Sequence, residues 1–180
     1  MNLLLGITGS VAAKLTPKLI NELQYCGFQV KAVATEFSLF FWNQSEAPVP
    51  IYRNRDEWPT KYESKSSVLH IELRNWADIL IIAPLSANTL AKIANGITDN
   101  LLTSVVRAWD RSRQIILAPA MNTHMWEHPV TAENLATLAR WYPHLKIIDP
   151  IHKVLECGDV GIGAMAEIHQ IVEEAKKCAR

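Results

Sequence analysis

The feature that most constrains the fold is a series of short apolar segments separated by stretches of helical pattern. These segments are residues 2–8 (NLLLGIT), 28–35 (FQVKAVAT), 77–85 (ADILIIAPL), 114–119 (QIILAP) and 146–150 (KIIDP), the last of which is expected to be the final strand. Their length and their apolar or β-branched composition are typical of β-strands. Strands of this kind that alternate with helices indicate a parallel sheet covered by helices on both faces.

The segments between the predicted strands carry residues that begin and end helices. We expect helices at residues 11–25, 37–43, 86–96, 99–110, 129–141 and 167–178, with the least regular part of the chain at residues 36–69. Pro17 should make the first helix begin late or bend, whereas Pro129 suits a first helical turn. Ser86 or Asn88 is expected to cap the third helix, and Asp99 the fourth.

Length and charge narrow the class of protein. The chain has 180 residues, of which 49% are hydrophobic, and its 18 basic and 18 acidic side chains cancel. This length predicts a single domain over residues 1–180, and the charge balance gives no indication of a nucleic-acid partner. No apolar stretch approaches the ~18 residues of a membrane span. Three scattered cysteines argue against a disulfide framework and favour a reducing compartment, the cytoplasm. The absence of metal-binding motifs argues against a metal site.

Candidate binding residues follow the predicted strands, where ligands bind in open α/β sheets. After the first strand, Gly9 and Ser10 lead into a helix. Backbone N–H groups at a helix start favour a phosphate, although an ordinary tight turn has the same pattern. After the second strand, Thr35 and Ser38 could bind a ribityl chain or a phosphate, or simply cap the next helix.

Two later strand ends carry further polar residues. Residues 86–89 (SANT) combine small polar side chains with helix-start N–H groups, which suits the edge of an isoalloxazine ring or a phosphate. In residues 118–129 (APAMNTHMWEHP), Asn122 stands among Met and Trp side chains that could be ordinary core packing. A buried amide without partners costs about 1–3 kcal/mol, so Asn122 is a candidate for binding a substrate.

A histidine and a cysteine are candidates for proton transfer. His70 lies in VLHIELRNWAD (68–78). Histidine is the side chain suited to proton transfer near neutral pH, although a single histidine is more often structural. Cys157 lies in LECGDVGIGAMAE (155–167), which is rich in glycine. Such a segment is typical of a mobile loop that closes over a substrate, or of a plain surface loop with an incidental thiol.

Together these motifs resemble those of the homo-oligomeric flavin-containing cysteine decarboxylase family. The resemblance rests on PLSANT (84–89), PAMNTHMW (119–126) and ECGDVGIGAMAE (156–167), and it runs from GITGSVAAK (6–14) to the last helix. VLHIELRNWAD and DNLLTSVVRAWDRS (99–112) are similar to the single-domain, halotolerance-protein type of phosphopantothenoylcysteine decarboxylase. The resemblance implies a three-layer Rossmann-like (flavodoxin-like) fold, an FMN cofactor, and homo-oligomers that are trimers or dodecamers built from trimers.

The same resemblance assigns functional positions. The residues that match FMN-binding positions are Gly9, Ser10, Val11, Thr35, Ser38, Ser86, Ala87, Asn88, Thr89 and Ala120. His70, Asn122 and Cys157 match the catalytic positions, and Asn122 and Met165 match substrate-binding positions.

The implied reaction is the decarboxylation of 4'-phosphopantothenoylcysteine to 4'-phosphopantetheine and carbon dioxide in coenzyme A biosynthesis. FMN accepts a hydride from the carbon that bears sulfur, which gives a thioaldehyde. Loss of carbon dioxide leaves an enethiolate whose charge is delocalised onto sulfur, and the hydride then returns. In this scheme His70 acts as a base or orients the carboxylate, Asn122 binds the substrate carboxylate or amide, and Cys157 supplies the final proton.

Other functions match parts of the pattern. A peptidyl-cysteine decarboxylase, which acts on a peptide C-terminus, shares the FMN, the histidine and the asparagine, whereas a flavin prenyltransferase does not need this set of residues. A non-enzymatic flavoprotein that regulates a phosphatase typically has a long acidic tail, which is not seen before Arg180. The chain also departs from the family at Val154 and Glu156, where a basic and a small residue are common.

Overall fold

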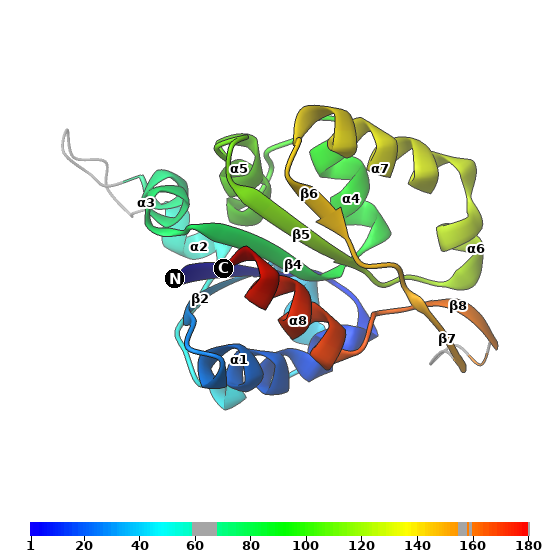
Figure 1. Ribbon diagram of the computed structural model, residues 1–180, viewed down its shortest axis with the longest axis horizontal. Coiled ribbons are helices and arrows are strands. Elements are labelled where there is room, and N and C mark those ends of the chain that lie inside the picture. The colour runs from blue at the N-terminus through cyan, green and yellow to red at the C-terminus, as the bar shows by residue number, and fades with distance from the viewer. Residues whose placement is uncertain (59–67, 155–157, 159, 180) are drawn as a thin grey trace.

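A parallel β-sheet forms the centre of the protein. The computed structural model describes residues 1–58, 68–154, 158 and 160–179, and within them six parallel strands form one sheet in the order β3-β2-β1-β4-β5-β6 (Figure 1). The strands are β1 (Asn2–Ile7), β2 (Gln29–Ala34), β3 (Ile51–Tyr52), β4 (Ile79–Leu85), β5 (Gln114–Pro119) and β6 (Leu145–Ile147). This order is that of Rossmann-type sheets, which bind ligands where the strand order reverses, here between β1 and β4. The predicted three-layer fold is confirmed.

Helices cover both faces of this sheet (Figure 1). One face carries α1 (Thr16–Tyr25) and α8 (Ile168–Cys178), and the other carries α3 (Leu69–Trp76), α4 (Ala87–Ala94), α5 (Leu101–Arg107) and α7 (Pro129–Trp141). Shorter helices are α2 (Asn54–Glu57), α6 (Thr123–Glu127), η1 (Val11–Leu15), η2 (Glu36–Phe40) and η3 (Gln44–Glu46). In the described part of the chain, no helix is long and apolar enough to cross a membrane.

The centre of the sheet is buried on both faces because β1, β4 and β5 are apolar over nearly their whole length. All seven residues of β4 are buried. On β1, Leu3 and Leu5 pack into one hydrophobic cluster with α1 and α8, whereas Leu4 packs into a second cluster with the opposite helices. This alternation of side chains between two helical layers is the reason that these central strands carry no polar face.

Proline decides where the first long helix begins. The chain forms the 3-10 helix η1 from Val11 and changes to the α-helix α1 only at Thr16, so that Pro17 falls in the first turn. N–H groups in the first turn of a helix have no partner within the helix, so the missing N–H of proline costs no hydrogen bond there. The predicted late start is confirmed, and the helix ends before Gly27, which has a φ of 88°. For α7, the predicted bounds and the predicted first-turn proline are both confirmed.

Several predicted element bounds are wrong. The expected helix at 37–43 is the 3-10 helix η2, which ends at Phe40. The expected helix at 99–110 is shorter, and its cap is Asn100 rather than Asp99, because Asn100 Oδ1 accepts a 3.0 Å hydrogen bond from the Thr103 backbone N–H. Asp99 instead forms an ion pair with Lys92.

The strand predicted to be final is followed by two more. β7 (Ile151–Val154) and β8 (Val160–Ala164) pair in antiparallel fashion as a separate ribbon beside α6 (Figure 1). The loop predicted over residues 155–167 is therefore in part a strand. The strand was not predicted because it contains glycines at 161 and 163, and glycine is depleted in strands. Here both glycines allow close packing on residues 121–123.

Candidate active site

A cavity of about 450 Å³ lies at the carboxyl ends of β1, β2 and β4. Its lining residues are Gly9, Ala34, Thr35, Glu36, Phe37, Asn54, Ser86, Asn88, Thr89, Lys92, Asp99, Asn100 and Leu101. Five of them were predicted from the sequence to bind the cofactor: Gly9, Thr35, Ser86, Asn88 and Thr89. The strand-end segments that are far apart in the sequence thus meet at one place, at the point where the strand order reverses.

The turn after β1 brings the backbone close to η2. A Cβ atom on Gly9 would lie 3.0 Å from the Cβ of Phe37, so a larger residue would push the two segments apart. Ser10 caps η1, and its Oγ accepts a 3.4 Å hydrogen bond from the Ala12 backbone N–H. Ser10 and Val11 flank the cavity in sequence without lining it.

Thr8 joins the end of β1 to the end of β4. Its side chain is fully buried, and its Oγ1 donates to the carbonyl oxygen of Pro84 at 2.8 Å while accepting from the Ser86 backbone N–H at 2.7 Å. This single hydroxyl fixes the backbone of Ser86, the first residue of the SANT segment. Sequence reasoning missed Thr8, although a polar residue directly after a buried apolar strand was a usable signal.

Replacing Thr8 by valine is expected to lower the free energy of unfolding by about 1–3 kcal/mol, because the Ser86 N–H would stay buried without a partner. The Pro84 carbonyl would lose the hydroxyl but keep its 3.2 Å hydrogen bond from the backbone N–H of residue 8. Thr16→Val is the matched control, since the Thr16 hydroxyl is also buried but has no hydrogen-bond partner. That control should leave stability unchanged or raise it. Urea unfolding of both variants measures the difference, and equal changes would contradict the assigned role of Thr8.

Ser86 begins α4 and turns its N-terminus toward the cavity. Its Oγ accepts from the Thr89 backbone N–H and donates to Thr89 Oγ1, both at 3.3 Å. Ser86 is therefore the cap, as one of the two predicted alternatives stated. Ala87 and Asn88 occupy the first turn, where backbone N–H groups and the helix dipole favour an anion.

The two candidates after β2 behave differently. Thr35 lines the cavity and precedes η2. Ser38 is fully buried, and its hydroxyl donates to the Thr35 carbonyl oxygen at 2.6 Å. The Ser38 hydroxyl is thus used within its own turn, and Thr35, the N-cap residue of η2, makes no side-chain cap hydrogen bond, so the capping alternative considered from the sequence is not realised.

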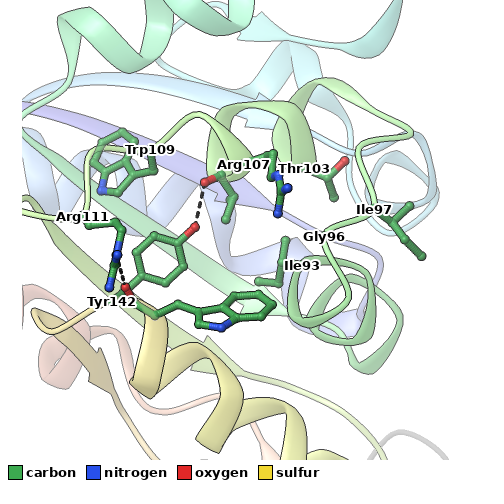
Figure 2. A pocket seen from close by; sticks show the side chains of 10 residues that line it. Ile93, Gly96, Ile97, Thr103, Arg107, Trp109, Arg111 and Tyr142 are labelled. Carbon is green, nitrogen blue, oxygen red and sulfur yellow. Dashed lines mark hydrogen bonds between the residues drawn. The ribbon is translucent and has the colours of Figure 1, made fainter.

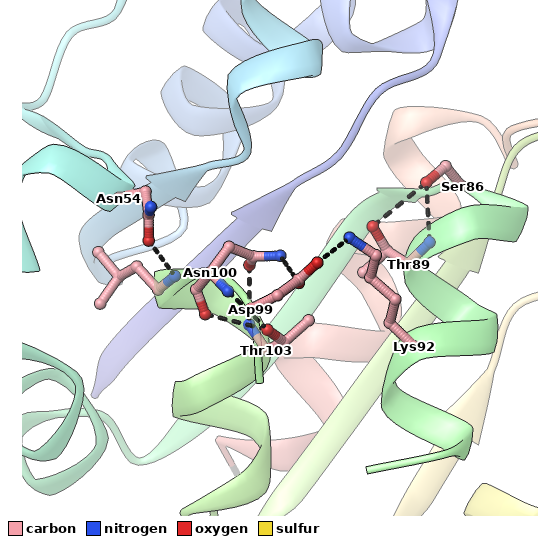
Figure 3. A network of polar contacts seen from close by, with 8 residues as sticks. Asn54, Ser86, Thr89, Lys92, Asp99, Asn100 and Thr103 are labelled. Atoms are coloured by element: carbon pink, nitrogen blue, oxygen red, sulfur yellow. Dashed lines mark hydrogen bonds and ion pairs between the residues drawn. The ribbon is translucent and has the colours of Figure 1, made fainter. Parts of the chain in front are cut away.

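A polar network forms the rim of the cavity (Figure 3). Lys92 on α4 forms an ion pair with Asp99, and this hydrogen bond lowers the pKa of the Asp99 carboxyl below its ordinary value. Asn100 donates to Asp99 at 2.9 Å, and Asn54 accepts from the Leu101 backbone N–H at 3.2 Å. The network ties α2, α4 and the start of α5 together around the cavity.

The PAMN segment lies beyond β5. Ala120 is buried in the core and its N–H donates to the Leu85 carbonyl oxygen at 2.9 Å. Asn122 caps α6, and its Oδ1 accepts from the His124 backbone N–H at 2.9 Å. Met121 donates its N–H to Gly163 of β8 at 2.9 Å, so the ribbon is docked on this segment.

The remaining substrate-contact candidate packs into the protein interior. Met165 follows β8 and is only 6% exposed, as part of the hydrophobic cluster beneath α1 and α8. A ligand would therefore meet Met165 only through the small part of its surface that stays accessible.

His70 pairs with a carboxylate that sequence reasoning missed. Glu57 Oε1 lies 2.5 Å from His70 Nδ1, and Glu57 Oε2 accepts from the His70 backbone N–H at 3.1 Å. The side chain of Glu57 is 6% exposed and that of His70 is 26% exposed. Glu57 belongs to α2, one helical turn after the cavity-lining Asn54.

His70 and Asn122, two of the predicted catalytic residues, do not meet within one chain. His70 is at the start of α3 and Asn122 at the start of α6, and Figure 1 shows these helices at opposite ends of the molecule. Elements that are separated in a projection are at least as far apart in space. Cys157, the third predicted catalytic residue, lies outside the described residues. Of the two positions at which the chain departs from the family, Glu156 also lies outside them, whereas Val154 is 67% exposed on β7.

A second cavity, of about 230 Å³, lies among α4, α5 and the end of α7 (Figure 2). Arg111 Nε donates to the Trp141 carbonyl oxygen at 2.5 Å, and the Tyr142 hydroxyl donates to the Val106 carbonyl oxygen at 2.9 Å. Burial raises the pKa of the Tyr142 phenol. No predicted site residue lines this cavity, which is on the helical layer rather than at the strand ends.

The fold and the strand-end cavity define a Rossmann-like α/β protein that is built to bind a ligand at its switch point. The chain belongs to the Flavoprotein family, whose model matches residues 1–180. It is 47% identical over 174 residues to the phosphopantothenoylcysteine decarboxylase of Mus musculus, an alignment that covers 96% of this chain and 84% of the mouse protein.

Two solved structures are similar over nearly the whole chain. A cysteine-to-serine mutant of PPC decarboxylase complexed with pantothenoylaminoethenethiol has a TM-score of 0.93 and 45% sequence identity, covering 98% of this chain and 96% of the other. The FMN binding protein AtHal3 has a TM-score of 0.88 and 46% identity, covering 98% of this chain and 95% of the other.

Proposed function

We propose that this protein catalyses the FMN-dependent decarboxylation of 4'-phosphopantothenoylcysteine to 4'-phosphopantetheine and carbon dioxide. The observation that carries the proposal is the likeness to the PPC decarboxylase complex, at 45% identity and a TM-score of 0.93. The compound in that complex is named as an aminoethenethiol, which is an enethiol joined to a pantothenoyl group. An enethiol of this kind is the intermediate expected when a cysteine carboxyl is lost after oxidation at the carbon that bears sulfur.

The residues of the strand-end cavity are compatible with FMN. The hydroxyl groups of Thr35 and Thr89 and the N–H groups of the first turn of α4 are donors suited to a phosphate or a ribityl chain. Gly9 leaves room for Phe37 to pack closely against the turn after β1, and Phe37 offers an apolar surface in the cavity. When bound, FMN supplies a reversible hydride acceptor, which makes the decarboxylation possible without net oxidation.

The protein side chains then bind and orient the substrate and move protons. Asn122 Oδ1 is held by the His124 N–H, which orients the side-chain amide as a donor to the substrate carboxylate or amide. Met165 contributes an apolar contact. His70 exchanges a proton at the substrate, and Cys157 supplies the proton of the last step.

We also propose that two chains share each active site in a homo-oligomer. His70 and Asn122 lie at opposite ends of one chain, so a site that uses both needs His70 from one chain and Asn122 from another. A closed ring such as a trimer provides this arrangement at every interface, and trimers can assemble further into dodecamers. The free thiols of Cys26 and Cys178 are in keeping with a location in the reducing cytoplasm.

Anaerobic incubation of the purified protein with 4'-phosphopantothenoylcysteine tests the function. We expect bound flavin, seen by its absorbance at about 450 nm, and a product lighter by one carbon dioxide in the mass spectrum. A peptide that ends in cysteine serves as the alternative substrate. Turnover of the peptide alone would replace the proposed substrate, and flavin binding without turnover of either would contradict the decarboxylase assignment.

A further inference from the structure

Glu57 makes two hydrogen bonds to the same residue. Its Oε2 accepts from the His70 backbone N–H at 3.1 Å, and its Oε1 lies 2.5 Å from His70 Nδ1. Both contacts close a gap of 13 residues in the sequence, from α2 to the first turn of α3. Among the residues that the structure describes, no other hydrogen bond to the His70 ring is found.

Capping of α3 explains only half of this arrangement. Val68, the N-cap residue of α3, has no side chain that can accept a hydrogen bond, and Glu57 Oε2 takes over that function from a distance. The second oxygen is directed to the imidazole. A carboxylate that is only 6% exposed is costly to bury unless it is paired, so the contact with Nδ1 also satisfies Glu57 itself.

We propose that Glu57 is a positioning residue that fixes the tautomer and the orientation of His70, so that Nε2 is the atom that exchanges a proton at the substrate. A carboxylate oxygen only accepts hydrogen bonds, so the hydrogen of the ring must be on Nδ1. Nε2 then carries the lone pair in the neutral ring. The proton exchange with the substrate rests on the proposed function. The tautomer of His70 is a property of the protein alone and can be measured without the substrate.

The surroundings of α2 explain how the pair is held near the cofactor cavity. Asn54, at the start of α2, lines that cavity and accepts from the Leu101 backbone N–H at 3.2 Å. Glu57 follows one helical turn later. The helix thus connects the rim of the cavity to the carboxylate that orients His70.

Glu57→Gln is the substitution that separates orientation from capping. A glutamine has the same shape but only one acceptor oxygen. If that oxygen keeps the His70 backbone N–H, the amide NH2 faces Nδ1 and forces the hydrogen of the ring onto Nε2. The comparable Asp-to-Asn change behind the histidine of a serine-protease triad leaves the geometry intact and lowers kcat about 10⁴-fold because the tautomer is wrong.

The test has two readouts on the flavin-loaded protein. In ¹⁵N NMR spectra at alkaline pH, the His70 signals (identified by their loss in His70→Gln) should report hydrogen on Nδ1 in the wild type and on Nε2 in Glu57→Gln. In turnover of 4'-phosphopantothenoylcysteine, kcat of Glu57→Gln should fall about 10²- to 10⁴-fold, with KM and flavin content nearly unchanged. Glu57→Asp, which keeps the charge, should retain the wild-type tautomer and more turnover than Glu57→Gln.

Glu22→Gln is the matched control, because it makes the same chemical change at an exposed position on α1 and should alter neither readout. Wild-type hydrogen on Nε2, or a Glu57→Gln protein with the wild-type tautomer, would overturn the proposal. So would a Glu57→Gln protein with the reversed tautomer and wild-type turnover. If the wild type itself fails to turn over the substrate, the proposed function is wrong, while the NMR result still decides the role of Glu57.

Discussion

Chains that carry only His70→Ala and chains that carry only Asn122→Ala are each expected to lose at least about 100-fold in turnover. Co-expressed in equal amounts, they are expected to recover about a quarter of the wild-type turnover in mixed oligomers. The reason is the separation of α3 and α6, which prevents His70 and Asn122 of one chain from meeting. In a closed ring, each site takes His70 from one chain and Asn122 from its neighbour. In an equal mixture, half of the chains have an intact His70 and the other half an intact Asn122. A site formed by two chains therefore has both residues in about one case in four.

A mixture of wild-type chains with chains that carry both substitutions is the control. If sites form between chains, this mixture also gives about a quarter of full turnover, whereas sites within one chain would give about a half. Sites within one chain would also leave the mixture of single variants inactive. Turnover of the purified mixed oligomers, with the two chains quantified by mass, therefore distinguishes the two arrangements, and an inactive mixture of the single variants would contradict the shared site.

Much of the fold could be predicted because it depends on local pattern. The strands are apolar over short runs, and Pro129 and Gly27 mark helix ends by their own backbone chemistry. The cofactor candidates Gly9 and Ser86 could also be predicted, because parallel strands carry their ends to a common edge and both residues follow such strands.

The parts that sequence reasoning missed depend on contacts between distant segments. The pairing of Glu57 with His70 spans a stretch without regular pattern, and nothing near Glu57 marks it as a partner of a histidine. Lys92 resembles any solvent-facing lysine on a helix until Asp99 is brought beside it. The strand β8 was not predicted because it contains glycines, which are rare in strands. These glycines are needed because β8 packs closely on residues 121–123, and this contact cannot be seen in the local sequence pattern.

Gly163→Ala, which alters this contact at β8, is expected to destabilise the protein strongly. Gly163 has a φ of 150°, and a Cβ atom there would lie 2.2 Å from the Met121 carbonyl oxygen. Strain and overpacking together should lower the free energy of unfolding by about 2–5 kcal/mol, or make the β7–β8 ribbon leave its place. The Met121 amide, which donates to Gly163 at 2.9 Å, should then lose its protection from hydrogen exchange.

Gly27→Ala separates strain from contact, because Gly27 has a φ of 88° but nothing within 4 Å of the added Cβ. Its cost should be about 1–2 kcal/mol, and the Met121 amide should stay protected. Since the strand-end cavity is built from other segments, Gly163→Ala should still bind flavin while turnover falls with the displaced Asn122 segment. Urea unfolding, hydrogen exchange and flavin absorbance test each part. A Gly163→Ala protein as stable and as protected as Gly27→Ala would mean that the ribbon does not hold the Asn122 segment in place.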